Sequence, residues 1–221
     1  FEKNFIHHLG SHNPYRRKDH QTAEDFCDEK VKEFENKILE IGSDKVAAYI
    51  AEPVLASGGC IVPPNNYIKR FWEICKKYDV LYISDEVVTA FGRLGHFFSS
   101  EEEFGIIPDI ITTAKGITSG YIPLGAVLIS DKLITQISKE STMLFHGFTY
   151  SGHPVSCAAA LKNIEIMKRD NILQHVKEIS PYFHQKLRKL YEIPIVGDVR
   201  GIGLMAGIEC VIDKKSKNPL V

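Results

Sequence analysis

Short hydrophobic runs alternate along the chain with longer segments that are typical of helices. Each run has the length of one β-strand, and the four runs are residues 46–51, 80–84, 110–114 and 126–130. Helices are predicted for residues 23–41, 65–79, 154–169 and about 171–190. Strands that alternate with helices predict an α/β layer architecture with a largely parallel sheet.

The character of each segment also predicts its surroundings. The runs 46–51 and 80–84 are hydrophobic throughout, so we expect both strands to be covered on both faces. Residues 92–105 are rich in Gly and Phe and predict a loop. Pro181 is expected to kink or split the last predicted helix, because proline removes one backbone hydrogen bond. Residues 203–209 predict a strand that begins a new unit.

The composition excludes several classes of protein. The 221 residues include 27 basic and 28 acidic side chains, a formal net charge of −1, so charge gives no reason to expect nucleic acid. Hydrophobic residues make up 44%, enough for a core, and no run approaches the roughly 18 apolar residues that a membrane span needs. The five cysteines include no CxxC pair, which indicates reduced thiols in a cytoplasmic protein.

The first 22 residues contain four histidines, His7, His8, His12 and His20. Their spacing is irregular and no cysteine or pair of carboxylates accompanies them, so a metal site is not expected. We interpret residues 1–22 as a solvated connecting segment.

An acidic residue and a lysine follow two of the predicted strands. Asp85 comes directly after the run 80–84, and Lys115 directly after the run 110–114. If these strands are parallel, both side chains lie at the same edge of the sheet, where the ligands of α/β proteins collect. A carboxylate that faces a protonated pyridine nitrogen and a lysine that attacks a carbonyl carbon are groups that suit pyridoxal phosphate.

Both residues also have simpler interpretations. Asp85 could cap a turn, and Lys115 could extend from a strand end into water. Because Lys115 follows apolar or small residues, we instead expect it in a crevice of low dielectric, which favours the neutral, nucleophilic form of the amine. Glu86, beside Asp85, is interpreted as structural.

Seven short motifs occur in one order between about residues 45 and 210. They are Ala51-Glu52-Pro53-Val54, Ile83-Ser84-Asp85-Glu86-Val87, Phe91-Gly92-Arg93-Leu94-Gly95, Pro108-Asp109-Ile110, Ala114-Lys115-Gly116, Pro123-Leu124-Gly125-Ala126 and His146-Gly147-Phe148-Thr149-Tyr150-Ser151-Gly152-His153-Pro154. This series resembles the class III aminotransferases, which are pyridoxal-phosphate enzymes of fold type I. The last motif is most similar to the ω-amino acid–pyruvate branch. The resemblance implies a three-layer α/β/α fold with a mostly parallel sheet, of which this chain holds a central part.

The resemblance implies a role for each matching residue. Lys115 matches the lysine that forms a Schiff base with pyridoxal phosphate and moves the proton between substrate and cofactor. Asp85 matches the partner of the pyridine nitrogen, and Val87 matches the residue that packs on one face of the ring. On its own sequence context, Val87 could equally be a core residue.

Further matches concern the phosphate, the substrate and the assembly. Thr149, with the backbone of Phe148 nearby, matches the threonine that binds the cofactor phosphate of a second subunit, which implies at least a homodimer. Glu52 matches a carboxylate near the substrate pocket that pairs with an arginine in many members. Thr149 could instead cap the helix that follows, and Glu52 could be an ordinary strand-end charge.

The implied reaction is transamination, in which an amine or ω-amino acid gives its amino group to a keto acid, with pyruvate as the expected acceptor. The alternatives are an aminomutase, a decarboxylating family member or a non-catalytic protein that keeps the scaffold. Residues 1–195 are expected to form part of the large cofactor domain, and residues 196–221 the start of a small C-terminal domain. The family's phosphate-binding loop and substrate arginine have no match here, so we expect this chain alone to bind the cofactor poorly and to show no turnover.

Overall fold

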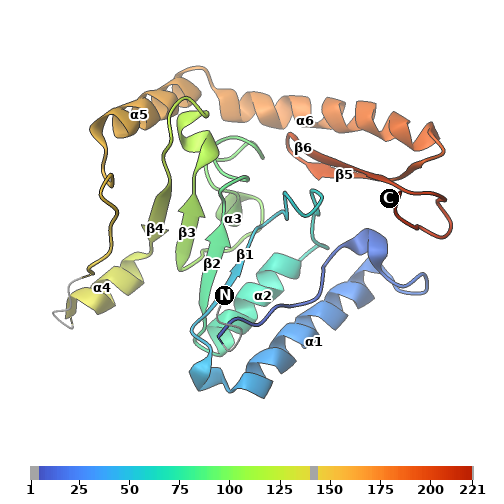
Figure 1. The fold of residues 1–221 in the computed structure, drawn as a ribbon, viewed down its shortest axis with the longest axis horizontal. Coiled ribbons are helices and arrows are strands. Elements are labelled where there is room, and N and C mark those ends of the chain that lie inside the picture. The colour runs from blue at the N-terminus through green and yellow to red at the C-terminus, as the bar shows by residue number, and fades with distance from the viewer. Residues whose placement is uncertain (1–4, 140–143, 221) are drawn as a thin grey trace.

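A four-stranded sheet forms the centre of the fold in the computed structural model, which describes residues 5–139 and 144–220. Its strands, in spatial order, are β1 (Ala48–Ala51), β2 (Leu81–Asp85), β3 (Ile110–Thr113) and β4 (Ala126–Ile129). The first three strands are parallel, and β4 is antiparallel to β3 (Figure 1). The predicted α/β fold with a mostly parallel sheet is therefore confirmed.

The described part of the chain also contains α-helices and a hairpin. They are α1 (Ala23–Ile41), α2 (Tyr67–Lys77), α3 (Ser99–Glu102), α4 (Asp131–Lys139), α5 (Pro154–Arg169), α6 (Ile172–Arg188), β5 (Val196–Ile202) and β6 (Met205–Cys210). The sequence pattern gave no indication of α3, α4 or β5. Of the two outcomes expected at Pro181, a kink or a split, the split is wrong, since α6 continues through that residue.

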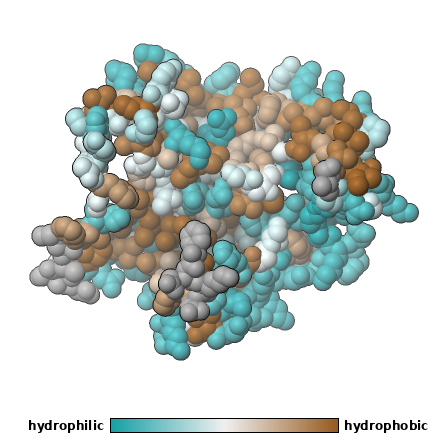
Figure 2. Space-filling view, in the orientation of Figure 1, coloured by the Kyte–Doolittle hydropathy of each residue, from teal (hydrophilic) through white to brown (hydrophobic). Residues whose placement is uncertain are grey.

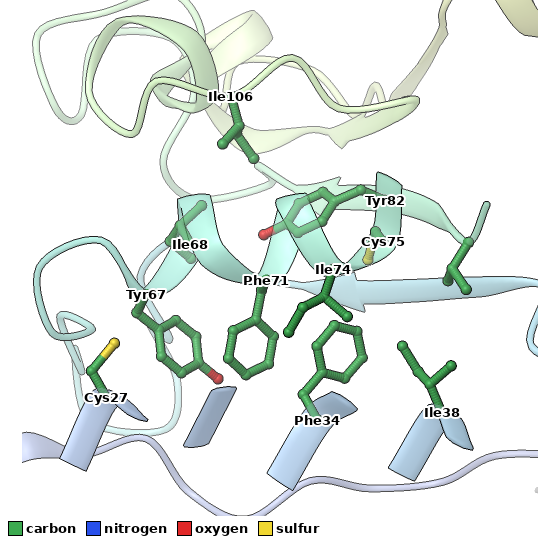
Figure 3. Close-up of a cluster of buried hydrophobic side chains, with 11 residues drawn as sticks. Cys27, Phe34, Ile38, Tyr67, Ile68, Phe71, Ile74, Cys75, Tyr82 and Ile106 are labelled. Atoms are coloured by element: carbon green, nitrogen blue, oxygen red, sulfur yellow. The ribbon is translucent and has the colours of Figure 1, made fainter. Parts of the chain in front are cut away.

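The helices α1 and α2 cover one face of the sheet with a cluster of aromatic and aliphatic side chains (Figure 3). The helix α1 begins at a capping box formed by Thr22 and Asp25, which satisfies two of its free backbone donors. Phe34 of α1 stacks on Phe71 of α2 with ring centroids 4.6 Å apart. Burial raises the pKa of the Cys75 thiol to about 12, so this core thiol is uncharged at neutral pH.

The opposite face of the sheet is hydrophobic, but the described residues cover it only partly. Ile50 of β1 is 59% exposed and Val127 of β4 is 60% exposed. Along β1, exposed and half-buried residues alternate, so the expectation that residues 46–51 are covered on both faces is wrong for this chain. A hydrophobic run shows that both faces favour apolar surroundings, and it does not show which segment provides them.

The β5–β6 hairpin is a separate two-stranded sheet that packs on the loops beyond β1 and β2. The guanidinium of Arg200 donates to the Gly59 carbonyl at 2.9 Å and to the Glu209 carboxylate at 2.6 Å. Glu209 also pairs with Arg16, so segments from the two ends of the chain are joined. Figure 2 shows hydrophobic residues gathered on the surface around the hairpin, and Ile208 of β6 is 47% exposed.

Candidate active site

The strands β2 and β3 bring the two residues singled out in the sequence to one edge of the sheet. They are parallel neighbours, and Asp85 at the end of β2 is in register with Thr112 of β3. Lys115 follows β3 closely, as the first residue of the 3₁₀ turn η3 (Lys115–Thr118). An acidic group and a primary amine therefore lie on adjoining strand ends, the usual place for a ligand in an α/β sheet. Their catalytic roles stay predictions.

Asp85 is half-buried at the end of its strand. Its Oδ1 accepts a hydrogen bond from the Val87 backbone N–H at 3.1 Å, which fixes the orientation of the carboxylate. By the alternation of a strand, Asp85 shares the open face of the sheet with Ile83. Thr112, its partner in register, has a buried hydroxyl without a hydrogen-bond partner among the described residues. A ligand with a polar edge fits this position, because buried polar groups are normally satisfied.

Lys115 has an unusual backbone conformation. Its φ is +42°, in the left-handed region, which costs a residue with a Cβ about 1–2 kcal/mol. Gly116 has no room for a side chain, because a Cβ there would lie 2.8 Å from the Cβ of Phe91. The side chain of Lys115 is exposed, so the expected crevice of low dielectric is wrong for the described residues. The sheet face beside it is open, which leaves the amine in water.

Glu86, directly after Asp85, is fully buried and stabilises this edge of the sheet. Its carboxylate accepts hydrogen bonds from the backbone N–H groups of Ser99 and Ser100, at 2.7 and 3.0 Å, and from both of their hydroxyls. The Thr89 hydroxyl donates to it as well, at 3.2 Å. These donors replace the water that the buried carboxylate has lost. The same bonds hold the first residues of α3, which explains why a segment predicted as a loop contains a helix.

A second supporting residue, Asn163 of α5, gave no signal in the sequence. Its Nδ2 donates to the carbonyl oxygens of Gly116 and Ile117, at 2.9 and 3.1 Å. Its Oδ1 accepts a hydrogen bond from the Ser119 hydroxyl at 2.8 Å. Only the fold brings α5 to the turn that begins at Lys115, so no local spacing could have indicated this contact.

The structure places Val87 and Glu52 at the same edge. Val87 is half-buried in the turn after β2, and Glu52 follows the end of β1. The Oε2 of Glu52 accepts a hydrogen bond from the Ala56 backbone N–H at 3.0 Å, a contact within its own loop. Arg200, the arginine that bonds this loop, forms its ion pairs with carboxylates of the hairpin. Pairing of Glu52 with an arginine stays a prediction.

Phe148 and Thr149 lie in an exposed turn before α5. The Phe148 backbone N–H donates to the Ser151 hydroxyl at 2.9 Å, and its side chain is 78% exposed. This turn and the loop 122–125 line one hollow of about 700 Å³. The Thr118 hydroxyl of η3 donates to the first carbonyl of that loop at 2.7 Å. The predicted phosphate-binding turn therefore faces the loop that continues from the Lys115 turn.

Comparison with known proteins decides the family. The family description that matches residues 3–221 is aminotransferase class-III. The chain belongs to the class-III aminotransferase family. The resemblance drawn from the seven motifs is thereby confirmed.

The class-III chain is similar to proteins about twice its length. The putrescine–pyruvate aminotransferase of Pseudomonas aeruginosa is 45% identical over 188 residues, which are 85% of this chain and 41% of that protein. The solved (S)-enantioselective omega-transaminase of Thermomicrobium roseum is 43% identical with a TM-score of 0.92, over 97% of this chain and 48% of that one. The omega transaminase of Pseudomonas jessenii in complex with PMP is 39% identical with a TM-score of 0.89, over 96% and 48%. This likeness confirms the predicted fold type I, and the chain spans less than half of each relative.

None of the described helices combines the length and apolar character needed to cross a membrane. Within the same residues, no group of three or more His, Cys, Asp or Glu side chains is placed to hold a metal ion. His12 of the N-terminal segment packs against Tyr67 with ring centroids 4.9 Å apart and ring planes tilted by 32°. Burial, with Lys30 nearby, lowers the pKa of His12 to about 4, so it is a neutral packing residue.

Proposed function

We propose that this class-III protein transfers the amino group of an amine or ω-amino acid to a keto acid, with pyruvate as the acceptor and pyridoxal phosphate as the cofactor. The observation that carries the proposal is the position of Asp85 and Lys115 at the ends of two adjacent parallel strands. Two relatives support it. One is named for putrescine and pyruvate, and the other is described with PMP, the amino form of pyridoxal phosphate.

The residues at this edge fit pyridoxal phosphate. The Lys115 amine suits its aldehyde, and the Asp85 carboxylate suits its ring nitrogen. When bound, the cofactor withdraws electrons from the amino-bearing carbon of the substrate, which makes the proton on that carbon acidic. Asp85 keeps a proton on the ring nitrogen, and the hydrogen bond from Val87 holds its carboxylate in place. Lys115 takes the proton from the substrate carbon and returns it at the cofactor C4′ position.

The remaining predicted residues bind rather than react. Val87 packs on one face of the cofactor ring, and Glu52 lies beside the substrate. Thr149 and the backbone of Phe148 bind the cofactor phosphate of a second subunit, so the protein acts as a homodimer or larger. Large exposed hydrophobic side chains around the Thr149 turn support an interface with a second copy, and they are Tyr121 (89%), Phe145 (95%), Phe148 (78%), Tyr150 (81%) and Leu161 (70%).

Assays of the natural, full-length protein loaded with pyridoxal phosphate test the proposal. We expect an amine donor and pyruvate to give alanine. We also expect borohydride to attach the cofactor covalently to Lys115, which mass analysis of the Lys115 peptide would detect. Replacing Lys115→Ala removes the group that moves the proton and lowers kcat by about 10³-fold or more. The control Lys162→Ala changes an exposed lysine of α5 and keeps the parent rate.

The outcomes separate the alternatives. Release of carbon dioxide, or a rearranged amine without alanine, indicates a decarboxylating enzyme or an aminomutase that uses the same Asp85 and Lys115. Failure of borohydride to fix any cofactor at Lys115 indicates a non-catalytic protein that keeps the scaffold, and contradicts the proposal.

We also propose that residues 1–195 belong to the large domain and residues 196–221 begin a smaller one. The separate two-stranded sheet of β5 and β6 supports this boundary. A cytoplasmic location is proposed on the five cysteines, all of which are free thiols.

A further inference from the structure

The turn that carries Lys115 is closed by local backbone hydrogen bonds. The backbone of Lys115 is in the left-handed region, with φ +42°. Within the turn, the Ser119 N–H donates to the Gly116 carbonyl at 3.1 Å, and the Gly120 N–H donates to the Lys115 carbonyl at 3.3 Å. A short 3₁₀ turn with a strained first residue relaxes unless neighbouring elements hold it.

Asn163 adds hydrogen bonds to this turn from α5. Its Nδ2 donates to the Gly116 carbonyl at 2.9 Å and to the Ile117 carbonyl at 3.1 Å. The Ser119 hydroxyl donates to the amide oxygen at 2.8 Å, which fixes which end of the amide faces the carbonyls. Asn163 therefore bonds three of the four residues that follow Lys115.

The packing of α5 in the core holds this amide in position. Ala160 and Met167, one turn before and after Asn163, are buried in one cluster with Phe91 and Ile117. Positions three and four apart lie on the same side of a helix, so Asn163 is directed at η3 by the packing of its own helix. On the other side of the turn, Gly116 rests against Phe91, where a Cβ would lie only 2.8 Å from the Cβ of Phe91.

We infer that Asn163 is a positioning residue for Lys115. From α5 it holds the carbonyl groups of the two residues that follow the lysine, and so it sets the direction from which the amine approaches the reacting atoms. This inference rests on the proposed role of Lys115, and it adds a residue for which the sequence gave no signal.

Three variants of the natural, full-length protein with pyridoxal phosphate test it. Asn163→Asp keeps the shape of the side chain but removes both donors and places a carboxylate against two carbonyls. Ser119→Ala keeps the donors and removes only the bond that orients the amide. Glu165→Gln is the control, because it makes the reverse exchange of carboxylate for amide on the exposed side of α5, where the Glu165 side chain is 58% exposed.

Two measurements apply to each variant. The first is the pH midpoint of the visible absorbance of the bound cofactor, recorded with kcat and KM. The second is hydrogen exchange of residues 117–120 in the cofactor-free protein. We expect Asn163→Asp to shift the midpoint by about half a pH unit or more and to lower kcat about tenfold with KM changed less than about twofold. Exchange of residues 117–120 becomes about tenfold faster. We expect Ser119→Ala to change the pH midpoint and the exchange rate in the same direction but by less. Glu165→Gln is expected to match the parent protein in each measurement.

A folded Asn163→Asp variant with the parent midpoint, kcat and exchange overturns the inference. If Asn163→Asp does not fold, Ser119→Ala decides: a shift in the same direction supports the inference, and parent values overturn it. If the parent protein carries no cofactor on Lys115, the proposed function fails, and the exchange rates alone decide whether Asn163 holds the turn.

Discussion

The two faces of the central sheet are both hydrophobic, yet they differ in what surrounds them. On the face packed against α1 and α2, Phe71 and Tyr82 are 0% and 1% exposed. On the other face Ile50 is 59% exposed, and at its edge Lys115 lies in water. Within this chain the first face stabilises the fold, and the second holds the groups suited to chemistry. The residues that stabilise the fold and the residues suited to chemistry thus lie on opposite faces of one sheet.

Two adjacent acidic residues repeat this contrast on a smaller scale. Glu86 is fully buried and bound by donors from Ser99, Ser100 and Thr89. Asp85 is half-buried, with Oδ1 bonded to a backbone N–H of the next turn. Because neighbouring residues point to opposite sides, one carboxylate anchors the loop while the other stays available to a ligand.

Removing an aromatic ring from the packed face is expected to have the largest effect. Phe71→Ala leaves a cavity between Phe34 and Tyr67 and lowers the free energy of unfolding of the 221-residue chain by about 3–5 kcal/mol. Ile50→Ala on the open face lowers it by less than about 1 kcal/mol, because that side chain is already in water. Urea denaturation measures both values. Similar losses for the two variants would contradict the contrast between the faces.

The packed side should also respond to acid through His12. Its pKa in the folded chain is about 4, below the ordinary value of 6.5, so the unfolded chain binds the proton first as pH falls. Stability present above pH 6.5 is therefore lost between about pH 6.5 and 4, on the order of 3 kcal/mol. His12→Phe keeps an aromatic ring packed against Tyr67 without the titration. The free energy of unfolding, measured between pH 6.5 and 4, should fall less steeply with falling pH for that variant. The same pH dependence in the variant and the parent would exclude His12 as the cause.

The smallest expected effect concerns the open edge. Lys115→Gly removes a Cβ from a residue with φ +42° and raises the free energy of unfolding by about 1 kcal/mol. Lys162→Gly, the same exchange inside α5, lowers it by about 1 kcal/mol because glycine is unfavourable in a helix. Thermal unfolding distinguishes the two signs. A loss of stability at position 115 would show that the turn does not strain the lysine.

The elements with their own local signal could be predicted from the sequence. The strands that end near Asp85 and Lys115, and the helix that begins at Pro154, have nearly the predicted bounds. The hydrophobic runs are sufficient to predict these strands, and the proline is sufficient to predict the start of this helix, because strand length and helix starts depend on nearby residues. The motifs around Asp85 and Lys115 were enough to indicate the family, which the comparisons confirm.

What the sequence could not provide depends on contacts between distant segments. The short helix α3 forms where Glu86 accepts its first N–H groups, and no pattern in residues 92–105 contains that carboxylate. The exposure of Lys115 and Ile50 depends on whether another segment covers the open face, which hydrophobicity alone does not determine. The role of Asn163 requires α5 to lie against η3, and only the fold establishes that.

The ionic contacts of Arg200, Glu209 and Arg16 have a practical consequence for any dissection of this protein. A fragment that ends at residue 195 would lack Glu209, which pairs with Arg16. It would also lack Arg200, whose guanidinium donates to the Gly59 carbonyl. It would also uncover Val54, which is 0% exposed beneath the hairpin cluster. Fragments meant to isolate the cofactor-binding half should therefore keep the chain through Cys210, even if that crosses the domain boundary.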